Sequence, residues 1–140
     1  EQITRSALGV SLTHEIKCGL WYGKLHERIT TILTGFGYGL SDCRVWRYWD
    51  NGQPVMLEGA PAKALILARQ GRALIAIVSY GPAGEVRLTL DRNALGLPEN
   101  IATIDAENGA VIERPAPDRL RLTLPRHDFR LITIGPASSQ

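Results

Sequence analysis

The sequence has few cysteines, few aromatic residues and almost no excess of charge of either sign. Its 140 residues include two cysteines, 6% aromatic residues, 16 basic and 14 acidic residues, which gives a formal net charge of +2. So small an excess gives no support for a nucleic-acid partner or for binding to a membrane surface, and we expect neither. No stretch approaches the roughly 18 consecutive apolar residues that cross a bilayer. Cys18 and Cys43 lack CxxC spacing and are expected to be buried free thiols.

The chain also lacks the short motifs that indicate catalysis or cofactor binding. It contains no GxSxG, HExxH or P-loop sequence, and the glycines from Gly35 to Gly39 are not followed by the rest of a dinucleotide-binding motif. Its three histidines, His14, His26 and His127, have no second ligand at metal-site spacing. We therefore expect neither a metal ion nor a cofactor.

What is present is the composition of an ordinary globular protein, with 44% hydrophobic and 21% charged residues. A length of 140 residues fits one domain, or one domain with a helical appendage. The first residue is Glu1, and no basic and apolar leader follows it, from which we expect a processed product or an excised piece.

The sequence at 35–42, GFGYGLSD, is rich in glycine and separates two kinds of periodicity. It divides the chain into an α-containing segment, residues 1–42, and a larger region, residues 43–140. In the first segment, apolar residues recur at helical spacing over residues 24–34 and predict an amphipathic helix. Its apolar positions are Leu25, Ile29, Ile32 and Leu33. Residues 6–17 fit either a helix or a short buried strand, and both interpretations stay open.

Downstream of residue 42 the hydrophobic pattern changes. Apolar and polar residues alternate over 85–91 and 119–124, which predicts strands with one buried face. The run ALIAIV at 73–78 is apolar throughout, as expected of a central strand covered on both faces. About seven strands are expected, at Arg44–Trp49, Val55–Leu57, Lys63–Ala68, Arg72–Tyr80, Glu85–Asp91, Ile101–Asp105 with Ala110–Glu113, and Leu120–Leu124 followed by Phe129–Ile134. This spacing predicts a mainly β fold, an antiparallel β-sandwich of Greek-key type with a short helical N-terminal segment.

The segment from Trp46 to Asp50 is the densest chemical feature of the sequence. On a strand, Trp46, Tyr48 and Asp50 would share one face, with an aromatic pair beside a carboxylate, and Trp49 would lie on the other face. Sugar rings stack on such aromatic platforms, because their faces are apolar and their hydroxyl groups need polar partners. The same side chains could instead be buried against another domain. Trp46, Tyr48, Trp49 and Asp50 are therefore candidates for carbohydrate binding or for domain docking.

His14 and Glu15 form the one place where two groups capable of acid or base chemistry adjoin the end of a candidate strand. Barrel enzymes place substrate-contacting residues at strand ends of this kind. One strand cannot close a barrel, so these two residues are barrel-mouth candidates only in the presence of further strands. An exposed polar pair is the alternative, and no catalytic residue is assigned within the chain.

From Arg44 to Gly135 the sequence resembles the C-terminal antiparallel β-sandwich that follows the catalytic (β/α)₈ barrel in many glycoside hydrolases and in uncharacterised glycoside-hydrolase-like proteins. The resembling motifs are, in chain order, VWRYWDNGQPV, KALILARQGRALIAIVSYG, VRLTLDRNALGLP, IDAENGAVI and LRLTLPRHDFRLITIG. In that family these positions shape the sandwich and its docking surface, and none of them is catalytic. The resemblance also implies that LGVSLTHEIK and KLHERITTILTGFG are the last strand and the last helix of such a barrel.

The function implied by the resemblance is that of a non-catalytic accessory domain in a glycoside-hydrolase-like protein, supporting and covering a catalytic barrel that is not part of this chain. The expected partner is the barrel of the parent chain or a second copy. In a first alternative, Trp46, Tyr48 and Trp49 bind an oligosaccharide and the chain is a carbohydrate-binding module. In a second, His14 and Glu15 belong to a glycosidase active site in the intact parent.

Overall fold

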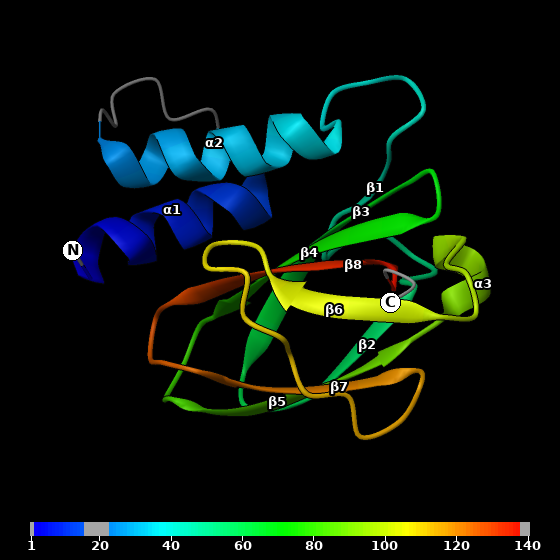
Figure 1. Ribbon diagram of the computed structural model, residues 1–140. Helices are drawn as coiled ribbons and strands as arrows, with labels where there is room; N and C mark the ends of the chain where they lie inside the picture. The colour runs from blue at the N-terminus through cyan, green and yellow to red at the C-terminus, as the bar shows by residue number, and fades with distance from the viewer. Residues whose placement is uncertain (1, 16–22, 138–140) are drawn as a thin grey trace.

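The computed structural model describes residues 2–15 and 23–137, which form three helices and eight strands arranged in three layers (Figure 1). The helices are α1 (Gln2–His14), α2 (Lys24–Phe36) and the short α3 (Arg92–Leu95). The strands are β1 (Arg44–Trp46), β2 (Val55–Gly59), β3 (Ala62–Arg69), β4 (Arg72–Ser79), β5 (Gly84–Leu90), β6 (Ile101–Asp105), β7 (Arg119–Leu124) and β8 (Phe129–Pro136). None of the described helices is both long enough and apolar enough to cross a membrane.

The strands form two antiparallel sheets that pack face to face. The five-stranded sheet has the order β1-β3-β4-β8-β6, and the three-stranded sheet has the order β2-β5-β7. From β5 onward each strand lies in the sheet opposite to the strand before it, so the connections cross repeatedly between the sheets. This arrangement confirms the predicted mainly β sandwich with a helical N-terminal segment. The strand expected at 110–113 is reduced to one isolated bridge between Ile104 and Val111.

The core between the two sheets is built by strands that alternate as predicted. Along β7, Leu120, Leu122 and Leu124 are buried while the residues between them are exposed. On the opposite sheet, every second residue of β4 points inward into the same cluster, namely Ala73, Ile75 and Ile77. The strands β5 and β7 of the three-stranded sheet, each with one buried and one exposed face, therefore close this side of the sandwich.

A second apolar cluster lies between the five-stranded sheet and the helices α1 and α2, which cover its outer face (Figure 1). The sheet contributes Leu65, Leu67, Leu74, Ala76, Val78, Phe129 and Leu131, and the helices contribute Leu8, Leu12, Ile29 and Phe36. The run ALIAIV is thus buried on both faces, as its lack of alternation predicts. The apolar face of the helical segment packs on the sandwich itself.

The alternatives left open for residues 6–17 are resolved in favour of a helix as far as His14. The interpretation of this stretch as the last strand of a barrel is wrong over residues 8–14, and residues 16–17 lie outside the described residues. The buried residues of α1 lie about one helical turn apart on the face toward the sheet: Leu8, Gly9, Leu12 and Thr13. Gly9 permits the close approach, since a Cβ atom there would lie 2.9 Å from Cγ1 of Val78.

The strand expected at 44–49 ends at Trp46, because the backbone turns immediately afterwards. The carboxylate of Asp50 accepts a hydrogen bond from the backbone N–H of Arg47 at 2.7 Å, and the N–H of Asp50 donates to the carbonyl of Arg47 at 2.9 Å. Such local side-chain bonds compete with sheet pairing. The prediction that Trp46, Tyr48 and Asp50 share one strand face is therefore wrong.

Candidate functional site

The C-terminal end of α1 meets the loop between β1 and β2, and this contact joins two groups of predicted site residues that are far apart in the sequence. The ring of His14 lies 5.4 Å from that of Tyr48 at an interplanar angle of 86°. It lies 6.2 Å from the ring of Trp49 at 24°, in a stacked arrangement. Tyr48 and Trp49 meet edge to face at 4.8 Å and 84°. These geometries are the ones that aromatic quadrupoles favour.

Two further side chains reach this place from the ends of adjacent strands. The ammonium Nζ of Lys63, on β3, lies 4.0 Å from the ring centroid of Tyr48 and 5.2 Å from that of Tyr80, which follows β4. The hydroxyl of Tyr80 shares a hydrogen bond with Thr13 on α1. We refer to His14, Tyr48, Trp49, Lys63 and Tyr80 as the His14 cluster.

The carboxylates beside the cluster are both engaged by one arginine. Arg47 donates from Nε to Oε2 of Glu15, and its NH1 lies 3.6 Å from Oδ2 of Asp50. The other carboxylate oxygen of Glu15 accepts a hydrogen bond from the hydroxyl of Tyr38 at 2.5 Å. The hydrogen bond and charge of Glu15 raise the pKa of Arg47, so the guanidinium stays charged.

Tyr38 is the most perturbed phenol among the described residues. Burial, and then its hydrogen bond to Glu15, raise its pKa to about 12. Loss of the proton would place a phenolate against the carboxylate of Glu15, which is electrostatically unfavourable. The hydroxyl of Tyr38 therefore acts as a fixed donor that holds Glu15 in place.

Trp46 does not join the other predicted aromatic residues. It pairs with Ile66 in the sheet register and packs, partly buried, against the cluster between the two sheets. The guanidinium of Arg44 lies 5.1 Å from its ring centroid. Because Lys63 faces the opposite side of the sheet, Trp46 is separated from the His14 cluster by the sheet itself.

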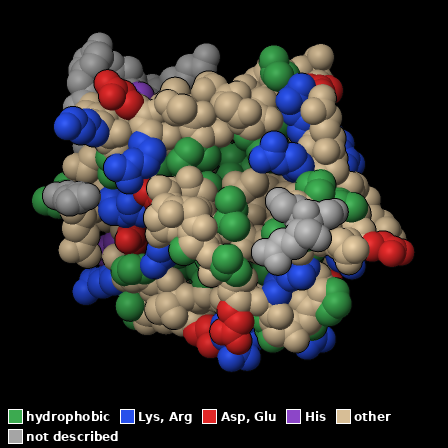
Figure 2. Space-filling view, in the orientation of Figure 1, with side chains coloured by type: hydrophobic (Ala, Val, Ile, Leu, Met, Phe, Trp, Pro, Cys, Tyr) green, Lys and Arg blue, Asp and Glu red, His purple; other side chains and the backbone are tan. Residues whose placement is uncertain are grey.

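The His14 cluster is partly open to solvent. Trp49 is 50% exposed and Tyr80 is 36% exposed, whereas Tyr48 and Lys63 are half-buried. The molecular face seen in Figure 2 carries basic and acidic side chains intermingled, with apolar side chains between them, and no large area of one charge sign. This face therefore presents no extended field of one sign that would attract a charged ligand from a distance.

Sequence reasoning missed Lys63, Tyr80 and Arg47 as members of the site or its surroundings. A signal for the first two was present, because the turn at Gln70-Gly71 folds β3 back along β4. The resulting register pairs Lys63 with Val78, two residues before Tyr80. A basic and an aromatic side chain at neighbouring strand ends were thus predictable from the hairpin, but their contact with α1 was not.

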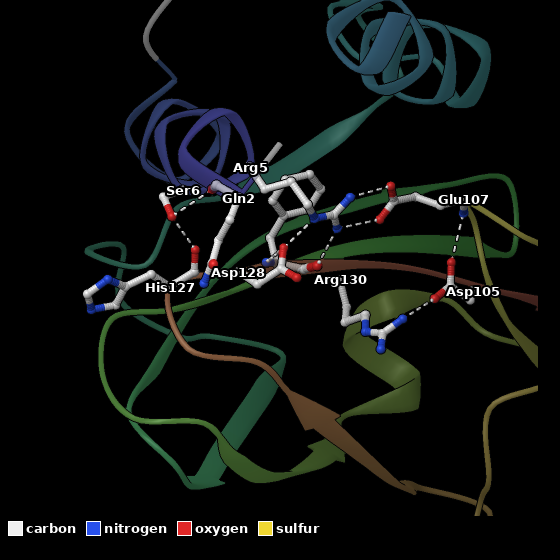
Figure 3. A network of polar contacts seen from close by, with 9 residues as sticks. Gln2, Arg5, Ser6, Asp105, Glu107, His127, Asp128 and Arg130 are labelled. Carbon is white, nitrogen blue, oxygen red and sulfur yellow. Dashed lines mark hydrogen bonds and ion pairs between the residues drawn. The ribbon is translucent and has the colours of Figure 1, made fainter.

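A separate network of hydrogen bonds and ion pairs holds the N-terminal part of α1 against the sandwich (Figure 3). Arg5 donates two hydrogen bonds to the carboxylate of Glu107, at 3.0 and 2.9 Å, and one each to Asp128 and to the backbone carbonyl of Phe129. Its guanidinium also lies 4.2 Å from the ring centroid of Phe129. The hydrogen bond to Glu107 is the largest influence raising the pKa of Arg5. These contacts orient α1 and so position His14 at its far end.

Metal-binding side chains are dispersed. No three His, Cys, Asp or Glu side chains are grouped as a metal site within residues 2–15 and 23–137. His26 lies on α2 and His127 in the turn before β8, both outside the His14 cluster. Cys43 is a free thiol, as predicted, but it is half-buried rather than buried, and Cys18 lies outside the described residues.

The fold and the site define a small antiparallel β-sandwich with a helical cover and an exposed aromatic cluster. No protein-family model matches the sequence, and no curated protein matches it. Among solved structures, the chain is similar to a glycoside hydrolase family 27 β-L-arabinopyranosidase from Geobacillus stearothermophilus, solved as the wild type and as a variant in complex with arabinose. It is also similar to a protein from Bacillus halodurans assigned as an α-N-acetylgalactosaminidase.

These similarities cover part of each molecule. The identity is 16–17% and the TM-score is 0.46 in all three cases. The matches cover 57–59% of this chain and 18–19% of the solved chains. The chain thus spans about a fifth of the length of the glycosidases that it matches.

Proposed function

We propose that this chain is a non-catalytic accessory domain of a glycoside-hydrolase-like protein, in which it supports and partly covers a catalytic barrel. The observation that carries the proposal is the engagement of both carboxylates near the candidate site. Glycoside hydrolysis needs two carboxyl groups free to act on the scissile bond. Here Glu15 uses one oxygen for Tyr38 and the other for Arg47, and Asp50 binds the backbone and side chain of Arg47.

Release of nitrophenol from a panel of aryl glycosides tests the non-catalytic role. We expect no turnover by the purified chain. Turnover that disappears in the Glu15→Gln or the Asp50→Asn variant would contradict the proposal. It would favour the alternative in which His14 and Glu15 serve a glycosidase active site, which stays a prediction for the intact parent.

An apolar strip on α1 supports the docking role. Ile3 is 83% exposed and Val10 is 43% exposed, and their spacing places them on one side of the helix with His14. The strip continues into the exposed ring of Trp49 through its stack on His14. Exposed apolar strips of this kind are typical of surfaces that another domain covers.

Substitution of the strip in the longer parent protein tests docking on the barrel. The double variant Ile3→Asp, Val10→Asp should lower the thermal inactivation temperature of the barrel, because two carboxylates would be buried in the interface. Val111, 85% exposed on the loop after β6, supplies the matched control Val111→Asp. Equal inactivation temperatures in the double variant, the control and the parent would contradict docking through α1.

A second candidate function, carbohydrate binding, is favoured by the half-exposed ring of Trp49 beside polar groups of the His14 cluster. A pyranose face can stack on the indole while its hydroxyl groups bind the side chains around it. Acrylamide quenching of tryptophan fluorescence, measured with a panel of oligosaccharides, tests this function. Protection by a sugar in the parent chain, and none in the Trp49→Phe variant, is the expected result. Identical quenching with every sugar contradicts it.

A further inference from the structure

The His14 cluster contains a cation that no described carboxylate neutralises, and we propose that its ligand is an acidic sugar, a glycan containing uronic acid. In this proposal the sugar carboxylate binds Lys63 and the sugar ring stacks on Trp49. The proposal rests on the carbohydrate-binding function above and names its ligand class.

The charges around the cluster leave Lys63 without an anionic partner. Glu15 and Asp50 are both paired with Arg47. Among the described residues, no carboxylate lies within ion-pair distance of the Lys63 ammonium, and no acceptor takes a hydrogen bond from it. A half-buried ammonium that lacks a carboxylate keeps N–H donors available for an anionic ligand.

The ammonium of Lys63 is also held in position before any ligand binds. It lies over the face of Tyr48 at 4.0 Å and near that of Tyr80 at 5.2 Å, and cation–π contacts of this geometry are attractive. Thr13 fixes the hydroxyl of Tyr80, and His14 packs against Tyr48. A side chain that is ordered in this way loses little entropy on binding.

The separation of the cation from the stacking surface suits one sugar residue. The centroid of Tyr48 is 4.0 Å from the Lys63 Nζ and 4.8 Å from the centroid of Trp49, so the last two points are at most 8.8 Å apart. A pyranose ring stacked on the exposed indole can direct its carboxylate across this span. A neutral hexose would offer a hydroxyl group there, which binds an ammonium less strongly than a carboxylate does.

Isothermal titration calorimetry of the purified chain with oligogalacturonates, and with neutral galacto-oligosaccharides of the same length, tests the inference. We expect the acidic sugars to bind at least about tenfold more tightly, by a margin that falls as salt is added. Lys63→Met should bring acidic binding down to the neutral level, because methionine keeps an apolar stem without the charge. Lys63→Arg should retain the preference, and Trp49→Ala should remove binding of both sugars.

The other outcomes separate this inference from the function on which it rests. Equal affinity for both sugars, unchanged in Lys63→Met, overturns the acidic-sugar assignment and leaves carbohydrate binding standing. If no oligosaccharide gives a heat of binding, both the acidic-sugar assignment and carbohydrate binding are overturned. Acetate binding as tightly as the oligogalacturonate would show an anion site with no role for the sugar ring, and would also overturn the inference. Circular dichroism of each variant establishes that it is folded.

Discussion

Arg5 and Glu107 are 102 positions apart in the sequence, yet the guanidinium of Arg5 donates two hydrogen bonds to the carboxylate of Glu107. Such paired bonds fix orientation as well as distance. Because Glu107 follows β6 and Arg5 lies on α1, the contact ties the N-terminal helix to the edge of the five-stranded sheet. The helix is therefore part of the packed structure, and its stability can be measured through this pair.

The Arg5→Met variant should lower the free energy of unfolding by about 2 kcal/mol, because Glu107 loses both hydrogen bonds from Arg5 and Asp128 keeps only the one from the backbone N–H of Phe129. Urea denaturation measures the change. The matched control is Arg87→Met, which removes an exposed pair with Glu85 and should cost less than about 1 kcal/mol. Equal losses of unfolding free energy in the two variants would contradict a stabilising role for the contacts of Arg5.

Gly9 and Gly35 offer a matched pair of helix glycines with opposite expected effects. Alanine at Gly9 places its Cβ atom 2.9 Å from Cγ1 of Val78, so the helix must move, at a cost of about 1–3 kcal/mol. Alanine at Gly35 meets nothing within 4 Å and should stabilise the chain by about 0.5–1 kcal/mol. Urea midpoints of the two variants are the measurement. Stabilisation by Gly9→Ala would show that α1 does not pack closely on β4.

The sandwich was predictable because the alternation of apolar and polar residues along a strand indicates by itself which face of that strand is buried. Leu120, Leu122 and Leu124 are buried as the period-two pattern predicts, and no information from distant residues is needed. The helical state of residues 6–14 was not predictable in this way. Leu8 and Leu12 fit a helix or a strand, and the choice is made by the outer face of β4, against which Gly9 packs. Tertiary packing decides where local patterns are ambiguous.

Three members of the His14 cluster were selected from the sequence one by one, whereas Lys63, Tyr80 and the assembly of the cluster were not. Tyr48 and Trp49 were selected for their aromatic rings and His14 for its chemistry, without any indication that they meet. Their contact depends on where α1 ends and on the turn that Asp50 forms with Arg47. Trp46 was placed with them because the strand was expected to continue, and the turn separates it from them.

The Tyr38→Phe variant should change how stability depends on alkaline pH. The pKa of Tyr38 is raised from its ordinary value near 10 to about 12 by burial and by Glu15. Its contribution to stability is therefore fully present below about pH 10 and is lost as the pH rises toward 12, because the unfolded chain releases the proton first. Urea denaturation across this range should show a steeper decline in the parent than in the variant. Parallel pH profiles would contradict the raised pKa.

Cys43 should react slowly with iodoacetamide near neutral pH. Burial raises the pKa of its thiol, so less of the reactive thiolate is present in the folded chain than in the unfolded one. A Cys18→Ser background isolates this thiol. The alkylation rate should increase on addition of urea, and the folded protein should need a higher pH to reach the same rate. A rate in the folded chain equal to that in urea would contradict this prediction.

β4 is buried on both of its faces, and its neighbour β3 shares this property only over Ala64–Ala68. Seven consecutive residues after Arg72 are buried, facing the helices and the opposite sheet in turn. In a complete substitution scan, β7 should therefore tolerate polar residues at every second position, whereas β4 should tolerate them nowhere between Ala73 and Val78. Tolerated substitutions should thus be concentrated in the three-stranded sheet and the loops, away from the strands β3, β4 and β8 that contribute to both cores.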